Sequence, residues 1–198
     1  MFQLLPGPPS LRGAIVAACL LLSATLASAD ELAGVHLDEA IKSEDGQTLF
    51  LNGAGLRERL WVDVYVGSLY LPRKSVDVAE ILSNPGPWRL QLDFIYKEVA
   101  REKILNSWRE GFEQNQAPEN LKRLQSRVDQ FYAYFQTSII ARDQYRFDYL
   151  PGKGVSIIKN GQQLGLIPGE DFKTALLEIW LGNHPADKSL KRGLLGLE

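Results

Sequence analysis

Residues 53–71 contain a glycine-rich segment and then a strand pattern whose two faces differ in chemistry. Side chains alternate along a strand, so the even positions of 60–66 form an aliphatic face that we expect to pack against helices or a second layer. The odd positions of 57–65 carry arginine, tryptophan, aspartate and tyrosine, a set that suits either solvent or a mixed pocket. We expect residues 53–55 to form a tight turn into this strand.

Other patterns predict the remaining elements. Asp-Gly at 45–46 and Asn-Gly at 160–161 are strong hairpin signals. The order of strands, a helix pair, a hairpin and more helices argues for an α+β fold with a mostly antiparallel sheet and helices packed on one face. We expect strands at 35–42, 47–51, 88–96, 145–149, 155–159 and 163–167, a short helix at 76–82, and longer helices at 99–114, from Pro118, at 170–181 and at 187–195.

The first 29 residues are typical of a secretion signal. Arg12 is their only charge, residues 14–27 are almost wholly apolar, and Ala-Ser-Ala at 27–29 fits the cleavage rule. The apolar run is shorter than the ~20 residues of a spanning helix, so we expect cleavage before Asp30 and no integral membrane segment in the mature protein. The predicted product is one domain, 30–198, in the periplasm; the alternative is an uncleaved anchor.

Loss of the signal would also remove the only cysteine, Cys19. Lipidation at this cysteine is disfavoured, because only three residues separate Arg12 from Val16, where a lipoprotein cleavage box would begin. The mature chain therefore has no residue for a disulfide or a thiolate site.

Composition and spacing argue against several classes of function. The net charge is −2 and charges of both signs are interspersed, which argues against nucleic-acid binding. The two histidines, His36 and His184, are far apart, so we expect no metal site. The pair Gly53 and Gly55 lacks the third glycine of a dinucleotide fold, and no serine lies in a Gly-x-Ser-x-Gly turn. We expect no cofactor.

Two motifs carry a resemblance to a known family. Gly-Ala-Gly-Leu-Arg at 53–57, followed by Tyr-Val-Gly-Ser-Leu-Tyr-Leu at 65–71, resembles the chalcone isomerase superfamily, in particular its bacterial chalcone isomerase-like branch. Residues 176–182 and 185–191 are similar to its closing helix, glycine turn and final helix. The resemblance spans roughly residues 33–196 and implies an open-faced β-sandwich with a ligand cleft between sheet and helices.

Arg57 is the strongest candidate site residue. The resemblance implies two roles, because plant chalcone isomerases use an arginine in this setting to polarise the substrate's carbonyl and phenolate region. The fatty-acid-binding branch pairs an arginine with a tyrosine to hold a carboxylate. Independently, a guanidinium is always charged and its planar fork of donors matches a carboxylate. The alternative is a structural salt bridge, with Asp63 or Asp93.

Three tyrosine and arginine positions follow as ligand-binding candidates. Tyr65 shares a strand face with Arg57, and the resemblance implies that it lies near the plant enzyme's substrate-oxygen threonine; the alternative is a core tyrosine with its hydroxyl at the rim. Tyr96 and Arg101 flank the start of the next long helix. The plant enzyme has its catalytic tyrosine there, but the matching frame places Ala100 at that position.

A second departure from the plant enzymes occurs at Ile179, where they carry a threonine or serine. Ring closure of a chalcone needs several preorganised donors, so we do not expect that activity. The leading hypothesis is non-catalytic binding of a small apolar ligand with a carboxylate or another anionic oxygen. The alternatives are an isomerase, acting as an intramolecular lyase on an enone-like substrate, and a partner-binding module whose cleft is filled by its own side chains.

Overall fold

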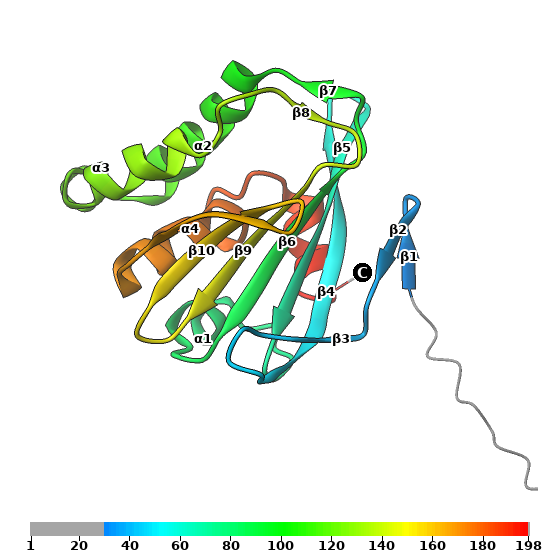
Figure 1. The fold of residues 1–198 in the computed structure, drawn as a ribbon, viewed down its shortest axis with the longest axis horizontal. Helices are drawn as coiled ribbons and strands as arrows, with labels where there is room; N and C mark the ends of the chain where they lie inside the picture. Colours follow the sequence, from blue (N-terminus) through cyan, green and yellow to red (C-terminus); the bar gives the residue numbers. More distant parts are fainter. Residues whose placement is uncertain (1–29, 198) are drawn as a thin grey trace, which may run out of the picture.

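The computed structural model describes residues 30–197 of the chain (Figure 1). The predicted secretion signal, 1–29, lies outside the described residues, so its cleavage stays a prediction. Between residues 30 and 197, no helix combines the length and the hydrophobicity needed to cross a membrane.

Seven antiparallel strands form one curled sheet in the order β11-β10-β9-β6-β5-β4-β3 (Figure 1). Two short ribbons, β1–β2 and β7–β8, lie outside it. The strands are β1 Asp30–Leu32, β2 Val35–Leu37, β3 Ala40–Lys42, β4 Thr48–Arg59, β5 Val62–Leu71, β6 Trp88–Phe94, β7 Glu98–Val99, β8 Ile139–Ile140, β9 Gln144–Leu150, β10 Gly154–Lys159 and β11 Gln162–Ile167. The helices are α1 Val78–Ser83, α2 Arg101–Asn115, α3 Pro118–Ala133, α4 Glu170–Leu181 and α5 Lys188–Leu194.

The predicted α+β class is confirmed, with helices packed on one face of the sheet. Alternation along β6 explains why the two faces differ: Leu90 and Phe94 join the core formed with the helices. On the other face, Arg89 donates through Nε and Nη2 to both carboxylate oxygens of Asp148, at 2.6 and 2.7 Å. Both carboxylate oxygens of this buried ion pair are therefore hydrogen-bonded, which offsets the cost of removing the two charges from water.

The predicted turn at residues 53–55 is wrong, because these residues lie inside β4 and pair with β5. The chain reverses at Leu60 and Trp61 instead, which have positive φ angles of 50° and 66°. Left-handed backbone costs about 1–2 kcal/mol for a residue with a side chain. The Asn-Gly hairpin at 160–161, by contrast, forms as predicted between β10 and β11.

The glycines of β4 serve close packing rather than a turn. A Cβ atom on Gly53 would lie 2.1 Å from the carbonyl oxygen of Gly193, and one on Gly55 would lie 3.1 Å from the Cα of Leu190. A Cβ on Gly193 would in turn lie 2.4 Å from the carbonyl oxygen of Ala54. The backbones of β4 and α5 are therefore in direct contact.

This contact also corrects the predicted orientation of β5. Gly53, Gly55 and Arg57 pair across the ladder with Leu69, Gly67 and Tyr65, and α5 covers that side. The odd positions of β5 from Tyr65 onward therefore face the helices, and Val66 lies on the other face, whereas Val62 and Val64 near the hairpin end line the helix side. Glycines on the odd face decide this, because they leave room for a helix that side chains would exclude.

We expect Gly53→Ala to destabilise the fold by at least about 1–3 kcal/mol, the usual cost of overpacking, because the new methyl group meets backbone rather than a movable side chain. Urea denaturation measures the change. Ala54→Ser, one residue away on the opposite face, is the control and should alter stability by no more than about 0.5 kcal/mol. Equal denaturation midpoints for Gly53→Ala and the unmodified protein would contradict this account of the β4–α5 contact.

Candidate functional site

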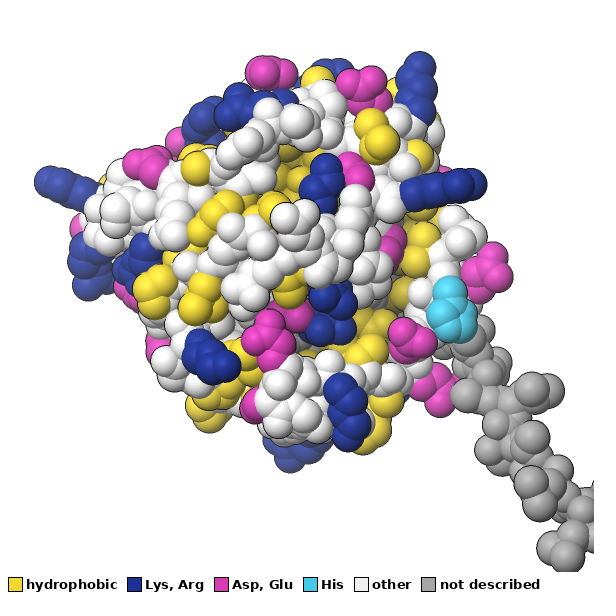
Figure 2. Space-filling view, in the orientation of Figure 1, with side chains coloured by type: hydrophobic (Ala, Val, Ile, Leu, Met, Phe, Trp, Pro, Cys, Tyr) yellow, Lys and Arg dark blue, Asp and Glu magenta, His cyan; other side chains and the backbone are white. Residues whose placement is uncertain are grey.

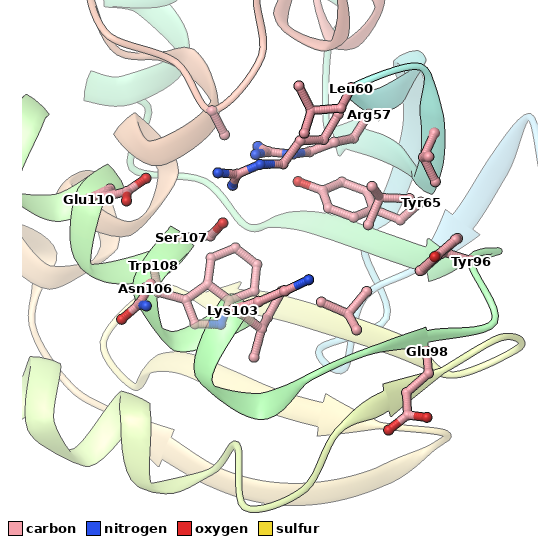
Figure 3. A pocket seen from close by; sticks show the side chains of 16 residues that line it. Arg57, Leu60, Tyr65, Tyr96, Glu98, Lys103, Asn106, Ser107, Trp108 and Glu110 are labelled. Carbon is pink, nitrogen blue, oxygen red and sulfur yellow. The ribbon is translucent and has the colours of Figure 1, made fainter.

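A cleft of about 440 Å³ lies between the hairpin end of β4–β5, the β7 segment and the first half of α2 (Figure 3). Its volume falls in the range of small-molecule sites. Three lining residues are cationic and two are carboxylates, so the lining charge is +1. The lining consists of Arg57, Arg59, Leu60, Val62, Val64, Tyr65, Tyr96, Glu98, Val99, Lys103, Ile104, Asn106, Ser107, Trp108, Glu110 and Ala186.

Arg57 lies at this cleft without a carboxylate partner. None of the ion pairs between described residues includes it. Its guanidinium carbon lies 6.0 Å from the ring centroid of Tyr65, within cation–π range. Asp93, one alternative partner, instead accepts amide hydrogen bonds from Gln91 and Gln144, both at 2.8 Å. The salt bridge offered as the structural alternative is therefore not formed.

Tyr65 pairs directly with Arg57 in the β4–β5 ladder and is only 2% exposed. Its hydroxyl oxygen accepts a hydrogen bond from Nε1 of Trp180 in α4, at 2.9 Å. Burial raises the pKa of Tyr65, and the positive charge of Arg57 opposes part of that rise. The phenol is thus neutral at physiological pH and keeps its proton.

The facing wall of the cleft comes from α2, whose polar residues are not among the site residues predicted from the sequence. Lys103, Ser107 and Glu110 lie opposite Arg57 and Tyr65 (Figure 3). Their spacing of four and three residues places them along one side of a helix. The sequence could have indicated these residues, because each directly precedes a buried residue of α2 and so lies at the edge of its buried face.

Aromatic rings fill the space between sheet and helices beneath the cleft. Trp108, which lines the cleft, lies 5.4 Å from Trp180 and 5.6 Å from Phe135 between ring centroids. Phe147 lies 5.7 Å from Trp180. The inner part of the layer is therefore filled by rings, and the cleft lies at the β4–β5 hairpin end.

Tyr96 and Arg101, the two further candidates, are placed differently. Tyr96 is partly buried and lines the cleft, at the end away from α2 residue Glu110 (Figure 3). Arg101 does not line the cleft: its Nε donates to the carbonyl oxygen of Phe135 at 2.8 Å. This bond ties the start of α2 to the segment that follows α3, which is a structural role.

Ile179, where the plant enzymes carry a hydroxyl, is also outside the cleft lining. It is fully buried in α4 and packs against Gly111 of α2, where an added Cβ would lie 2.7 Å from Cγ2 of Ile179. In the described part of the chain, no group of three His, Cys, Asp or Glu side chains is placed to hold a metal ion.

The fold and the cleft define an α+β protein with a seven-stranded antiparallel sheet, helices packed on one of its faces, and an arginine–tyrosine pair at the open end. A family model described as chalcone isomerase-like matches residues 29–196, so the chain belongs to the chalcone isomerase-like family. The finer resemblance to its bacterial branch stays a prediction. Comparison with curated protein sequences gives no significant match.

Among solved structures, the crystal structure of a fatty-acid binding protein from Arabidopsis thaliana is similar, with a TM-score of 0.62. The two sequences are 18% identical, and the alignment covers 84% of this chain and 94% of the plant protein. At this identity the comparison supports the shared fold, including the open-faced arrangement of sheet and helices.

The Trp180–Tyr65 hydrogen bond can be tested by paired substitutions. Trp180→Phe removes its donor, whereas Trp88→Phe removes an equally buried indole whose Nε1 has no hydrogen-bond partner within residues 30–197. Both changes delete the same volume, so we expect Trp180→Phe to cost about 1–3 kcal/mol more in chemical denaturation, the price of leaving buried groups unpaired. Equal losses would show that this hydrogen bond contributes no net stability.

Proposed function

We propose that this protein binds a small amphiphilic carboxylate, of the fatty-acid type, and does not transform it. The observation that carries the proposal is the pairing of Arg57, which makes no ion pair with a described residue, with the buried neutral hydroxyl of Tyr65. A carboxylate placed between them accepts from the guanidinium and from the phenol at once. Such charge-assisted hydrogen bonds contribute about 1.5–3 kcal/mol each.

Trp180 prepares Tyr65 for this role. Because the indole donates to the phenolic oxygen, the hydroxyl keeps its proton available for an outside acceptor. A buried phenol has few orientations to lose on binding, which lowers the entropic cost of holding the ligand. The pair therefore supplies orientation as well as charge.

The rest of the cleft suits the hydrocarbon part of the ligand. Val62, Val64, Val99, Ile104 and the ring of Trp108 supply apolar surface next to the arginine–tyrosine pair. Burying each methylene is worth about 0.8 kcal/mol. A chain of several methylenes would thus supply most of the affinity, from which the costs of immobilising the ligand are subtracted.

The comparison with known structures supports the same proposal. The similar plant protein is described as a fatty-acid binding protein. At 18% identity the comparison supports a common fold but no residue roles. The assignment of Arg57 and Tyr65 as ligand-binding residues therefore rests on the geometry of this chain. The isomerase alternative needs several preorganised donors around a developing oxyanion, and Ile179 carries no hydroxyl where the plant enzymes have one.

We expect Arg57→Ala to weaken decanoate binding by about 10- to 100-fold, the equivalent of 1.5–3 kcal/mol, with little change in thermal stability because no ion pair is lost. Isothermal titration calorimetry measures the affinity. Arg57→Lys should retain part of it, since the charge remains but the planar fork does not. Binding should also fall as the carboxylate protonates below about pH 4–5.

Arg101→Ala is the matched control for this experiment. It removes a guanidinium that anchors α2 outside the cleft, so stability should fall while decanoate affinity is retained. If Arg57→Ala binds decanoate like the unmodified protein but unfolds at lower temperature, the role of Arg57 is structural. Turnover of an enone substrate that Arg57→Ala abolishes would support the isomerase alternative instead.

We also propose that the protein acts after export, in the periplasm. The support is the charge, apolar run and Ala-Ser-Ala sequence of the first 29 residues. Amino-terminal sequencing of the protein purified from a periplasmic extract should begin at Asp30. An intact first methionine on membrane-bound protein would favour the uncleaved anchor.

A further inference from the structure

The tip of the β4–β5 hairpin exposes large apolar side chains beside the cleft. Trp61 is 97% exposed and Leu60 is 84% exposed, although three other tryptophans of the chain, Trp88, Trp108 and Trp180, are buried. Leu60 and Val62 line the cleft, so Trp61 projects from its rim. This indole is therefore in contact with solvent, whereas the other three tryptophans are packed in the core.

The turn chemistry shows that the residues at 60–61 are not there to make the turn. Both have positive φ, where Asn-Gly is the usual choice and bulky side chains are disfavoured. The same chain uses Asn160 and Gly161, with φ angles of 49° and 82°, for its other two-residue hairpin. A strained backbone that carries exposed leucine and tryptophan is typical of a functional segment.

We propose that this hairpin tip docks the protein onto a lipid bilayer, with the Trp61 indole in the interfacial layer and the cleft facing the membrane. Tryptophan favours that layer because its ring is apolar while its N–H can still form a hydrogen bond with water or a lipid head group. Leu60 and the exposed Ile140 add apolar surface. Ile140 pairs with Glu98 of the cleft lining, and Figure 1 shows β7, β8 and the hairpin tip at one end of the molecule.

The size of the patch favours lipid over a protein partner. An aromatic residue buries about 150–250 Å², and two aliphatic side chains add less, so the patch falls well short of the ~800 Å² per partner of a stable protein interface. Insertion into a bilayer needs no complementary partner surface. A single indole with neighbouring leucine or isoleucine is the scale of an interfacial anchor.

Charges near the tip define the kind of bilayer. Arg59 and Lys103 are exposed cations, but Glu58 and Asp63 are exposed carboxylates directly opposite each other in the ladder. The upper edge of the molecule in Figure 2 shows apolar side chains among charges of both signs. A zwitterionic surface matches this mixture, and docking would be apolar rather than electrostatic.

Docking would give the cleft a source of ligand. This step rests on the proposed function, since it assumes that the ligand is an amphiphile that dissolves in membranes. The docking itself does not rest on that assumption, and the two can be tested separately.

The test uses phosphatidylcholine vesicles and the full mature protein. We expect co-sedimentation with vesicles, a blue shift of tryptophan emission, and quenching by bromine-labelled lipid, since the other three indoles are already buried. Trp61→Gly should lower the partition coefficient at least tenfold and raise thermal stability, because glycine suits positive φ. Added salt should leave the binding unchanged.

Two controls separate docking from other outcomes. Val76→Asn changes another exposed apolar residue, next to α1 at the opposite end of the molecule, and should leave vesicle binding intact (Figure 1). Trp61→Gly should bind decanoate in solution like the unmodified protein, because Trp61 is not part of the cleft lining. Docking without decanoate binding would overturn the proposed function but support this inference.

Several results would overturn the docking proposal. They are failure of the unmodified protein to sediment with vesicles, equal partition of Trp61→Gly, and loss of binding on addition of salt. A concentration-dependent dimer that Trp61→Gly abolishes, in the absence of vesicle binding, would assign the patch to a second copy of the chain.

Discussion

The contact between the backbones of β4 and α5 determines the arrangement of the cleft. Glycines on both elements remove the side chains that would hold them apart, and the strand ladder then fixes which β5 residues face the helices. Arg57 follows Gly55 by two residues, so it lies on that same face. A packing requirement at one end of the strand thus orients the charged group at the other.

The segment that joins α4 to α5 connects two contacts that both hold the β4–β5 strand pair in place. Trp180, near the end of α4, donates to Tyr65, and α5 rests on the glycines of β4. Between them, the backbone N–H of Ala186 donates to the carbonyl oxygen of Ile179 at 2.7 Å, and Asp187 caps α5 through the N–H of Leu190. The geometry of the cleft therefore depends on the last 20 or so residues, far from Arg57 in sequence.

Much of the fold could be predicted from periodicity and turn chemistry. The helix at 170–181 and the Asn-Gly hairpin at 160–161 are found as predicted, because apolar spacing and local turn preference act within a few residues. The turn into β5 could not be predicted, since Leu60 and Trp61 contradict local preference and Gly53 imitates a turn signal. The true role of Gly53 is to contact the backbone of α5, about 140 residues later in the chain.

The same limit applies to the site. The sequence pointed to Arg57 and Tyr65 through alternation and family motifs, and the structure brings them together. Arg101 matched the expected site by residue type and by position in the chain. Its hydrogen bond to Phe135, however, is a tertiary contact that no local sequence pattern reveals. The partnership of Tyr65 with Trp180 is likewise a long-range contact, across 115 positions.

The solid aromatic layer beneath the cleft has a consequence for selectivity. For a ligand of the proposed kind, held by its carboxylate at Arg57, a tail that points inward would meet the ring of Trp108 and the aromatic layer behind it. Exchange of that one ring for a smaller side chain would deepen the well and admit longer tails, while head-group recognition stayed the same. Under the proposed function, the depth of the cleft and the recognition of the carboxylate would thus depend on different residues and could be altered separately.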